Sequence, residues 1–196
     1  MSKVVPIRAK YEAGYPDPYL ESPPASLSAD AEVANAGRTL RDWSRHLAAN
    51  SATCISIFDS RVCDGVGTGL VYQPMVRTRG GELHKRANDE IAKFLKKWRR
   101  KPDVTGQMSA GKVERLVWRL WDVDGEVFVR EVVFPDDRRM PYRVQIIESD
   151  MVPYSIMTQD RQTVMGIEMN DWGMPRSYLV MKQRRGDIFS AGTASY

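Results

Sequence analysis

Residues 121–152 constrain the possible folds of this chain more than any other stretch. The run 127–134 is rich in valine and phenylalanine, and residues 142–147 alternate between two faces. A polar connection bracketed by Pro135 and Pro141 separates the two runs. β-Branched runs with proline only at their edges are typical of strands, and two of them joined by a polar turn predict a β-hairpin.

This hairpin divides the chain into three regions of different character. Residues 1–29 form a proline-rich N-terminal arm, residues 30–121 a helical region, and residues 122–196 a β-hairpin region. A second hairpin is expected from residues 166–173 and 178–181, which flank a turn with glycine and proline. The sequence therefore predicts an α+β fold, in which long N-terminal helices pack on a small antiparallel β-hairpin sheet.

The arm contains more aromatic residues than a solvated tail. Its prolines remove backbone donors and prevent a regular helix. Tyr11, Tyr15 and Tyr19 are nevertheless spaced along it. Two interpretations remain, a solvated tail and an arm that docks on its own body or on that of a neighbour.

Apolar periodicity predicts helices through the region 30–121. A long helix is expected over 28–64, with a weak point near Asn50, and another helix over 109–121. The glycines of residues 65–69 end the first helix. A dinucleotide-binding glycine loop follows a strand and opens a helix, so the reverse order here argues against nucleotide binding.

The predicted helix 82–101 holds the basic surplus of the chain. Residues 76–119 contain 13 Lys and Arg against 5 Asp and Glu, and the formal net charge of the whole chain is +4. One face of this helix is apolar and the other is basic. The candidate contact residues on the basic side are Lys93, Lys96, Lys97, Arg99, Arg100 and Lys101. They suit contacts with DNA phosphates or with a neighbouring subunit, and the alternative is a solvated helix face.

Three tryptophans are candidate core or interface anchors. Trp98 lies on the basic helix, and Trp118 and Trp121 lie on the next one. Cys54 and Cys63 are nine residues apart in one predicted helix. They therefore lie on opposite faces, roughly 13 Å apart along the axis, and are expected to be unpaired thiols.

Asp122, Asp124 and Glu126 are the strongest candidates for a metal site. Asp124 also begins an Asp-Gly turn dipeptide, and an extended strand would place all three carboxylates on one face, where they could hold a divalent cation. The EF-hand pattern fails, because its twelfth position would need a glutamate. His46 and His84 are isolated from other ligands.

A second acidic set resembles the core of a metal-dependent nuclease. Asp137 precedes Glu148 and Asp150, but the Glu-x-Lys of such cores is absent. We therefore expect no catalytic residue, no metal ligand and no cofactor. No run of 18 apolar residues and no signal peptide occurs in the sequence, so no membrane partner is expected.

Several segments, in the same order along the chain, resemble the portal proteins of lambda-like tailed phages and their prophages. The matching segments are Tyr11-Glu12-Ala13, the arginine-rich helix from Arg38 to Asn50-Ser51, Val66-Gly67-Thr68-Gly69-Leu70, the linker with Trp98, Pro102-Asp103 and Gly106, Asp124-Gly125-Glu126-Val127-Phe128, Gln145-Ile146-Ile147-Glu148-Ser149-Asp150, and Gly166-Ile167-Glu168 with Gly173 and Tyr178. Ala49 replaces the arginine that precedes Asn50 in the family. The resemblance covers about residues 11–180.

This resemblance implies a structural, non-enzymatic subunit of a ring, usually dodecameric, at the portal vertex of the capsid. Double-stranded DNA of any sequence would pass through the ring during packaging and ejection. The implied partners are further copies of the chain, terminase, capsid and head-completion proteins. The chain would be made in the cytoplasm of the bacterial host and end up in the virion. Members of the family are longer, so this chain would correspond to the N-terminal, wing-side portion.

Two alternative functions follow from the residues alone. The basic helix suits a small DNA-binding protein, and the acidic residues suit, less well, a metal-dependent nuclease.

Overall fold

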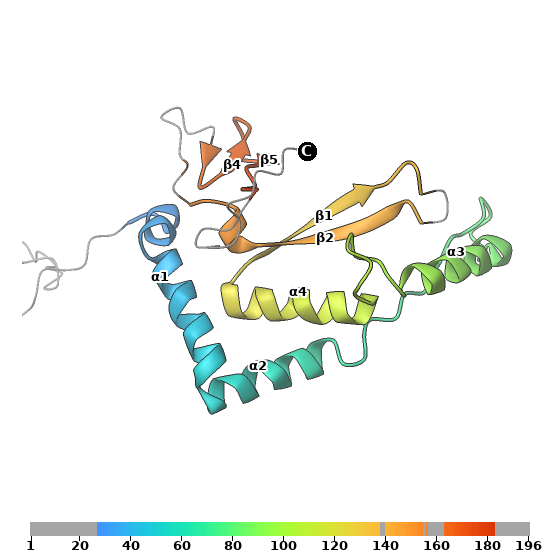
Figure 1. Ribbon diagram of the computed structural model, residues 1–196. Helices are drawn as coiled ribbons and strands as arrows, with labels where there is room; N and C mark the ends of the chain where they lie inside the picture. Colours follow the sequence, from blue (N-terminus) through green and yellow to red (C-terminus); the bar gives the residue numbers. More distant parts are fainter. Residues whose placement is uncertain (1–26, 138–139, 155, 157–162, 183–196) are drawn as a thin grey trace, which may run out of the picture.

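The computed structural model describes residues 27–137, 140–154, 156 and 163–182 (Figure 1). Its elements, in chain order, are α1 (Ala29–Asn50), α2 (Ala52–Gly65), α3 (Lys85–Trp98), α4 (Ala110–Asp124), β1 (Val127–Val133), β2 (Tyr142–Glu148), the 3₁₀ helix η2 (Ser149–Met151), β3 (Thr163–Val164), β4 (Ile167–Met169) and β5 (Pro175–Tyr178). Helices followed by antiparallel sheets confirm the predicted α+β class. The tyrosines of the arm and the chain beyond residue 182 lie outside the described residues.

The predicted weak point in the first helix is a break between two helices. Ser28 begins α1, where its Oγ accepts from the Ala31 amide at 3.3 Å. Ser51 ends α1 and begins α2: its amide donates to the Leu47 carbonyl at 2.9 Å, and its Oγ accepts from the Cys54 amide at 3.4 Å. Serine is a favoured N-cap, because its hydroxyl satisfies an amide that has no partner in the first turn.

The helix α4 continues three residues beyond its predicted end, which corrects the expectation of an extended strand over residues 122–126. Asp122 and Asp124 lie in the last turn of α4. Gly125 follows with a φ of 83° and donates its amide to the Trp121 carbonyl at 3.0 Å. Glycine adopts this left-handed conformation without steric cost, so the Asp-Gly pair ends a helix here and does not turn a hairpin.

The first predicted hairpin is confirmed, and its second strand supplies two of the six buried apolar residues of the described chain. β1 and β2 pair in antiparallel register from Val127 with Glu148 to Val133 with Tyr142. The ribbon lies along α4 (Figure 1). The buried apolar residues of the described chain are Val66, Ala110, Val113, Val144, Ile147 and Val152. They come from α4, β2 and adjoining loops, so the core lies between α4 and the ribbon.

The second predicted hairpin is confirmed with a shift of its last strand. The sheet has the order β3-β4-β5, and the last strand is Pro175–Tyr178, earlier than the expected 178–181. Asn170 explains the shift: its Oδ1 accepts from the amides of Trp172 at 3.0 Å and Met174 at 2.9 Å. This side chain closes a tight turn, so the returning strand begins directly after it. The short strand β3 was not predicted.

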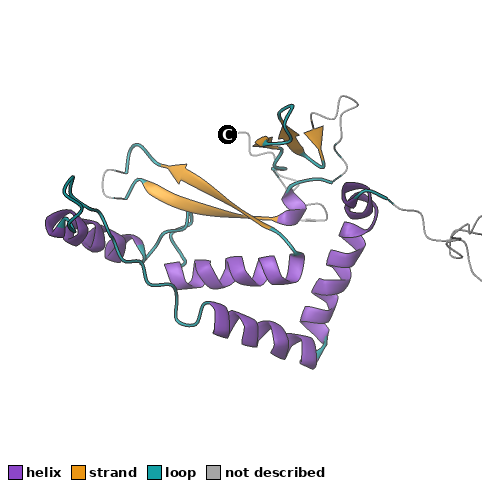
Figure 2. Cartoon of the chain, turned by 180° about the vertical axis from the view of Figure 1, so that it is seen from behind, coloured by secondary structure: helices purple, strands orange, loops and turns teal. Residues whose placement is uncertain are grey.

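The helices α1, α2 and α4 pack against one another, whereas α3 projects beyond the ribbon (Figures 1 and 2). At the end of α2, a Cβ on Gly65 would overlap the ring of Trp118, so glycine allows α4 to approach closely. His84 begins α3, since its Nδ1 accepts from the Ala87 amide at 3.2 Å. None of the helices in the described ranges is both long and apolar enough to cross a bilayer.

Candidate functional site

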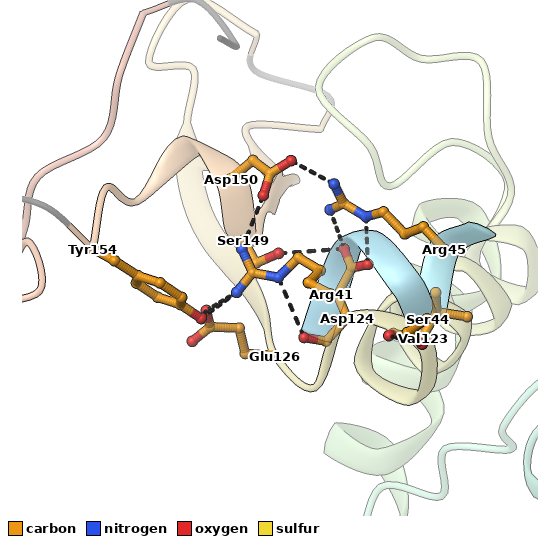
Figure 3. Close-up of polar contacts among 9 residues, drawn as sticks. All are labelled: Arg41, Ser44, Arg45, Val123, Asp124, Glu126, Ser149, Asp150 and Tyr154. Carbon is orange, nitrogen blue, oxygen red and sulfur yellow. Dashed lines mark hydrogen bonds and ion pairs between the residues drawn. The ribbon is translucent and has the colours of Figure 1, made fainter. Parts of the chain in front are cut away.

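Arg41 is a buried arginine at the centre of a polar cluster between α1, the end of α4 and the ribbon (Figure 3). Its side chain is 5% exposed. Nη2 donates to Glu126 Oε1 at 2.8 Å, and Nη1 donates to Asp150 Oδ1 at 2.9 Å. The same guanidinium contacts the Asp124 carbonyl and the hydroxyl of Tyr154. A single side chain of α1 therefore contacts four residues, which belong to the two segments 124–126 and 150–154.

Arg45 lies one turn further along α1 and completes the cluster. It holds Asp124 with two parallel bonds, from Nε to Oδ1 at 2.7 Å and from Nη2 to Oδ2 at 2.6 Å. It also donates to Asp150, which thereby connects both arginines. Ser149 Oγ donates to Asp124 Oδ2 at 3.3 Å. Bidentate arginine–carboxylate pairs fix orientation as well as distance, so they set the angle of α1 against α4.

The charges of the cluster shift the pKa values of its members. Burial alone would raise the pKa of Asp150, but the hydrogen bonds from Arg45 and Arg41 outweigh it and lower the pKa to about 2. The bonds to Asp124 hold the pKa of Arg45 above its ordinary value in spite of burial. Burial, with the hydrogen bond to Glu126 at 2.5 Å, raises the pKa of Tyr154 to about 12. Tyr154 is therefore a neutral donor, and the aspartate stays ionised.

The low pKa of Asp150 predicts a loss of stability in acid. Its pKa falls from 3.8 to about 2 on folding, so the unfolded chain binds the proton first as the pH decreases. The stabilisation is complete above pH 3.8 and is lost as the pH falls to about 2. We expect a loss of about 1–2 kcal/mol, allowing for partial exposure of the side chain. Urea unfolding between pH 5 and pH 2 measures it.

The matched control for this prediction is an exposed aspartate. Asp150→Asn should flatten the pH dependence of the unfolding free energy, whereas replacement of the exposed Asp171 should leave it unchanged. An equal slope for the Asp150 variant and the unmodified chain would contradict the assignment.

The structure separates the three carboxylates that could have held a divalent cation in an extended strand. Asp122 pairs with Arg61 at 2.8 Å, while Asp124 and Glu126 contact the two arginines of α1. Within the described residues, no set of three His, Cys, Asp or Glu side chains is placed to hold a metal ion. The left-handed turn at Gly125 breaks the strand geometry that would have aligned them. The acidic residues instead join elements of the fold.

The helix α3 ends at Trp98, before the predicted end at residue 101, so the predicted basic stripe continues into the turn after α3. The stripe lies largely in solvent. Lys93 forms an exposed pair with Glu90 at 2.8 Å. The other exposed members are Lys96, Lys97, Arg100 and Lys101. Arg99 differs from them, because it points back to the body.

Arg99 joins α3 to the loop after α2 and to α4. Its Nη1 lies 3.4 Å from Glu114 Oε1 and also donates to the Leu70 carbonyl. Its guanidinium lies 5.1 Å from the centre of the Tyr72 ring. Arg99 therefore supports the position of α3, and the exposed stripe consists of its neighbours.

The three candidate tryptophans have different surroundings. Trp98 is half-buried, and its Nε1 donates to the Tyr142 carbonyl at 3.0 Å. Trp118 is half-buried beside Gly65, and its Nε1 has no hydrogen-bond acceptor in the described part of the chain. Trp121 packs edge-on against Trp118, with 5.8 Å between ring centres, yet it is 56% exposed. Trp98 anchors α3 within the chain, and Trp121 lies at the surface.

Asp103 organises the joint between α3 and α4. It is 2% exposed, and its carboxylate accepts from the amides of Met108 at 2.9 Å and Thr105 at 3.1 Å. Burial opposes ionisation, but these bonds and the one from the Thr105 hydroxyl lower the pKa of Asp103. The two neighbours of Asp103 in the chain bond to β2. The Val144 amide donates to the Pro102 carbonyl at 2.8 Å, and the Val144 carbonyl accepts from the Val104 amide at 3.0 Å. The joint thereby lies along the edge of β2.

Sequence reasoning did not identify Arg41, Arg45 or Asp103 as important residues. Arg41 and Arg45 are four residues apart, which places them on one helix face. That spacing, together with the acidic residues in 122–126, was the sequence feature from which the ion pairs of Arg41 and Arg45 could have been predicted. Asp103 was noted only within the Pro-Asp motif.

Comparisons with known proteins agree with the resemblance in the sequence. The family described as phage portal protein, lambda family, matches residues 21–196. A probable portal protein of Halomonas phage phiHAP-1 is 30% identical over 115 residues, which cover 53% of this chain and 21% of that protein. The chain therefore matches about a fifth of the length of this relative.

Proposed function

Because this chain belongs to the lambda family of phage portal proteins, we propose that it is a structural subunit of a portal ring at a capsid vertex, through which double-stranded DNA is packaged and ejected. The family match over residues 21–196 is the observation that carries this proposal. The family is structural. The proposed partners are further copies of the chain, terminase, capsid and head-completion proteins, and the proposed location is the virion after synthesis in the host cytoplasm.

The polar cluster supports a structural role. Each of its carboxylates is held by an arginine of α1, so the cluster fixes α1 to α4 and the ribbon. A subunit that must keep its shape while DNA moves past it needs such rigid joints between its elements. The glycine that ends α4 and the arginines of α1 together create this joint.

The size of the purified 196-residue chain tests the proposed assembly. We expect native mass spectrometry and electron microscopy to find closed rings that form as the concentration rises. A chain that stays monomeric at every concentration would contradict the proposal.

The exposed basic stripe on α3, comprising Lys93, Lys96, Lys97, Arg100 and Lys101, is proposed to contact a neighbouring subunit in preference to DNA. Replacing Lys93, Lys96, Lys97 and Arg100 with glutamine should leave the melting temperature within about 2 °C, because exposed charges contribute little to stability. The same variant should assemble roughly tenfold more weakly and lose the salt dependence of assembly.

A control variant and a DNA-binding assay distinguish contact of the stripe with a neighbouring subunit from contact with DNA. Glutamine at Lys112, an exposed cation on α4 outside the stripe, should not affect assembly. Unchanged assembly, combined with lost binding to random duplex DNA, would assign the stripe to DNA instead. Unchanged behaviour in both assays would exclude a role for the stripe.

A further inference from the structure

The helix α1 turns its apolar stripe away from the body. Two of its arginines, Arg41 and Arg45, point inward to the polar cluster (Figure 3). Leu40, Trp43 and Leu47, spaced i, i+3 and i+7, form one stripe and are 65%, 61% and 45% exposed. A helix in a monomer normally buries its apolar face and exposes its charges. The reverse arrangement in α1 indicates that the stripe meets another molecule.

A hollow beside this stripe provides a receptor for side chains. It has a volume of about 440 Å³ and lies between α1 and the end of α4. Val33, Gly37 and Leu40 line it from α1, with Val123 and Tyr154 opposite. The volume accommodates at least one large apolar side chain.

A second apolar surface without a partner lies on α3, at the other end of the molecule. Ile91 and Phe94 are exposed there, one turn apart on the apolar face of the helix. The preceding segment adds the exposed side chains of Met75, Val76 and Leu83. At the end of α3, Trp98 contacts Tyr142. We call this surface the α3 face, and Leu40, Trp43 and Leu47 the α1 stripe.

The charges around the two surfaces are opposite. The exposed charges described on α1 are the acidic Asp30, Glu32 and Asp42 and the basic Arg38. Arg38 and Asp42 each lie about 160° round the helix from Leu40, so the acidic Asp30 and Glu32, each about 80° from it, are the charges on the side of the stripe. Arg86, Lys93 and Lys97 border the α3 face, and the acidic Glu90 beside them is paired with Lys93. Such surfaces attract each other, while two copies of the α3 face repel.

We infer that the α3 face of one copy packs on the α1 stripe of the next copy, with an aromatic or aliphatic side chain of α3 in the hollow. The two helices lie at opposite ends of the molecule (Figures 1 and 2), so one chain does not join its own surfaces. A contact between two different surfaces is head-to-tail, and its repetition builds a closed ring when the rotation from copy to copy closes. This inference rests on the proposed function and names the surfaces that would form the ring.

Complementary variants test the inference. One chain carries Leu40→Glu and Trp43→Glu, which block the α1 stripe, and the other carries Ile91→Glu and Phe94→Glu, which block the α3 face. Each variant alone should self-associate at least tenfold more weakly than the unmodified chain. An equimolar mixture should form one-to-one dimers and nothing larger, because each variant keeps one intact surface. Native mass spectrometry with one chain isotopically labelled distinguishes these species.

Dimers in the mixture also show that both variants are folded. Val133→Glu is the matched control, since Val133 is 65% exposed like Leu40 but lies at the end of β1. Two results would overturn the inference and leave the proposed function intact, provided that the unmodified chain forms rings. In the first, either blocked variant assembles as well as the unmodified chain. In the second, the mixture of the two variants stays monomeric. The absence of any assembly by the unmodified chain would instead contradict the proposed function.

Discussion

Arg41→Met should lower the free energy of unfolding by about 3 kcal/mol. Methionine fills much of the same space, but Glu126, Asp150 and the hydroxyl of Tyr154 each lose the guanidinium as a donor, and Glu126 keeps only the Tyr154 hydroxyl among its described donors. Removing one partner of a buried ion pair costs about 3–5 kcal/mol, because the remaining charge stays desolvated. We place the loss at the lower end, since Glu126 and Asp150 are partly exposed and Asp150 keeps Arg45. Urea unfolding followed by circular dichroism measures the change.

Arg38→Met is the control for this experiment. Arg38 lies one turn earlier on α1 and is exposed, so its replacement should change the stability by less than about 0.5 kcal/mol. Adding Glu126→Leu to Arg41→Met should restore part of the loss, because the unpaired carboxylate is then removed. Equal stability of the Arg41 and Arg38 variants would show that the cluster does not hold α1 in place.

Asp103→Ala should cost about 2–4 kcal/mol. The buried carboxylate accepts hydrogen bonds from the amides of Met108, Thr105 and Gln107 in the loop between α3 and α4, and alanine leaves these amides without this acceptor. Each buried donor that loses its acceptor costs about 1–3 kcal/mol, and the effects are not fully additive. Because the joint aligns α3 with β2, the variant should also assemble more weakly at temperatures where it remains folded.

Asp103→Asn provides a graded test of the same site. The amide keeps one acceptor oxygen and loses the negative charge, so the loss should be intermediate between that of alanine and zero. Asp136 is an exposed aspartate in the connection between β1 and β2, and Asp136→Ala should be neutral. A neutral effect of Asp103→Ala would show that water satisfies the loop amides as well as the carboxylate does.

The local elements of the fold could be read from the sequence because their signals are short-range. The alternation in 142–147 and the β-branched run in 127–134 correctly predicted the ribbon β1–β2. Likewise, serine at position 51 interrupts two helical patterns where the structure has a break. Resemblance to a family, carried by short segments in order, also identified the class of protein.

The candidate site could not be predicted in the same way, because it consists of long-range pairs. The acidic residues 122–126 suggested a cation site as long as they were treated as one extended segment. Gly125 divides them between a helix and a strand, and arginines from about 80 residues earlier neutralise two of them. Nothing in the local pattern around Arg41 or Arg45 specifies these partners.

The sequence by itself determined where helices and strands form and which family the chain resembles, since periodicity, capping residues and motif order act over a few residues. The tertiary structure decided which faces are covered. It turned Arg41 and Arg45 of α1 inward and Leu40 and Leu47 outward, the reverse of what amphipathic periodicity predicts. The physical reason is that a buried arginine is stable only beside several carboxylates, and folding alone brings those carboxylates to it.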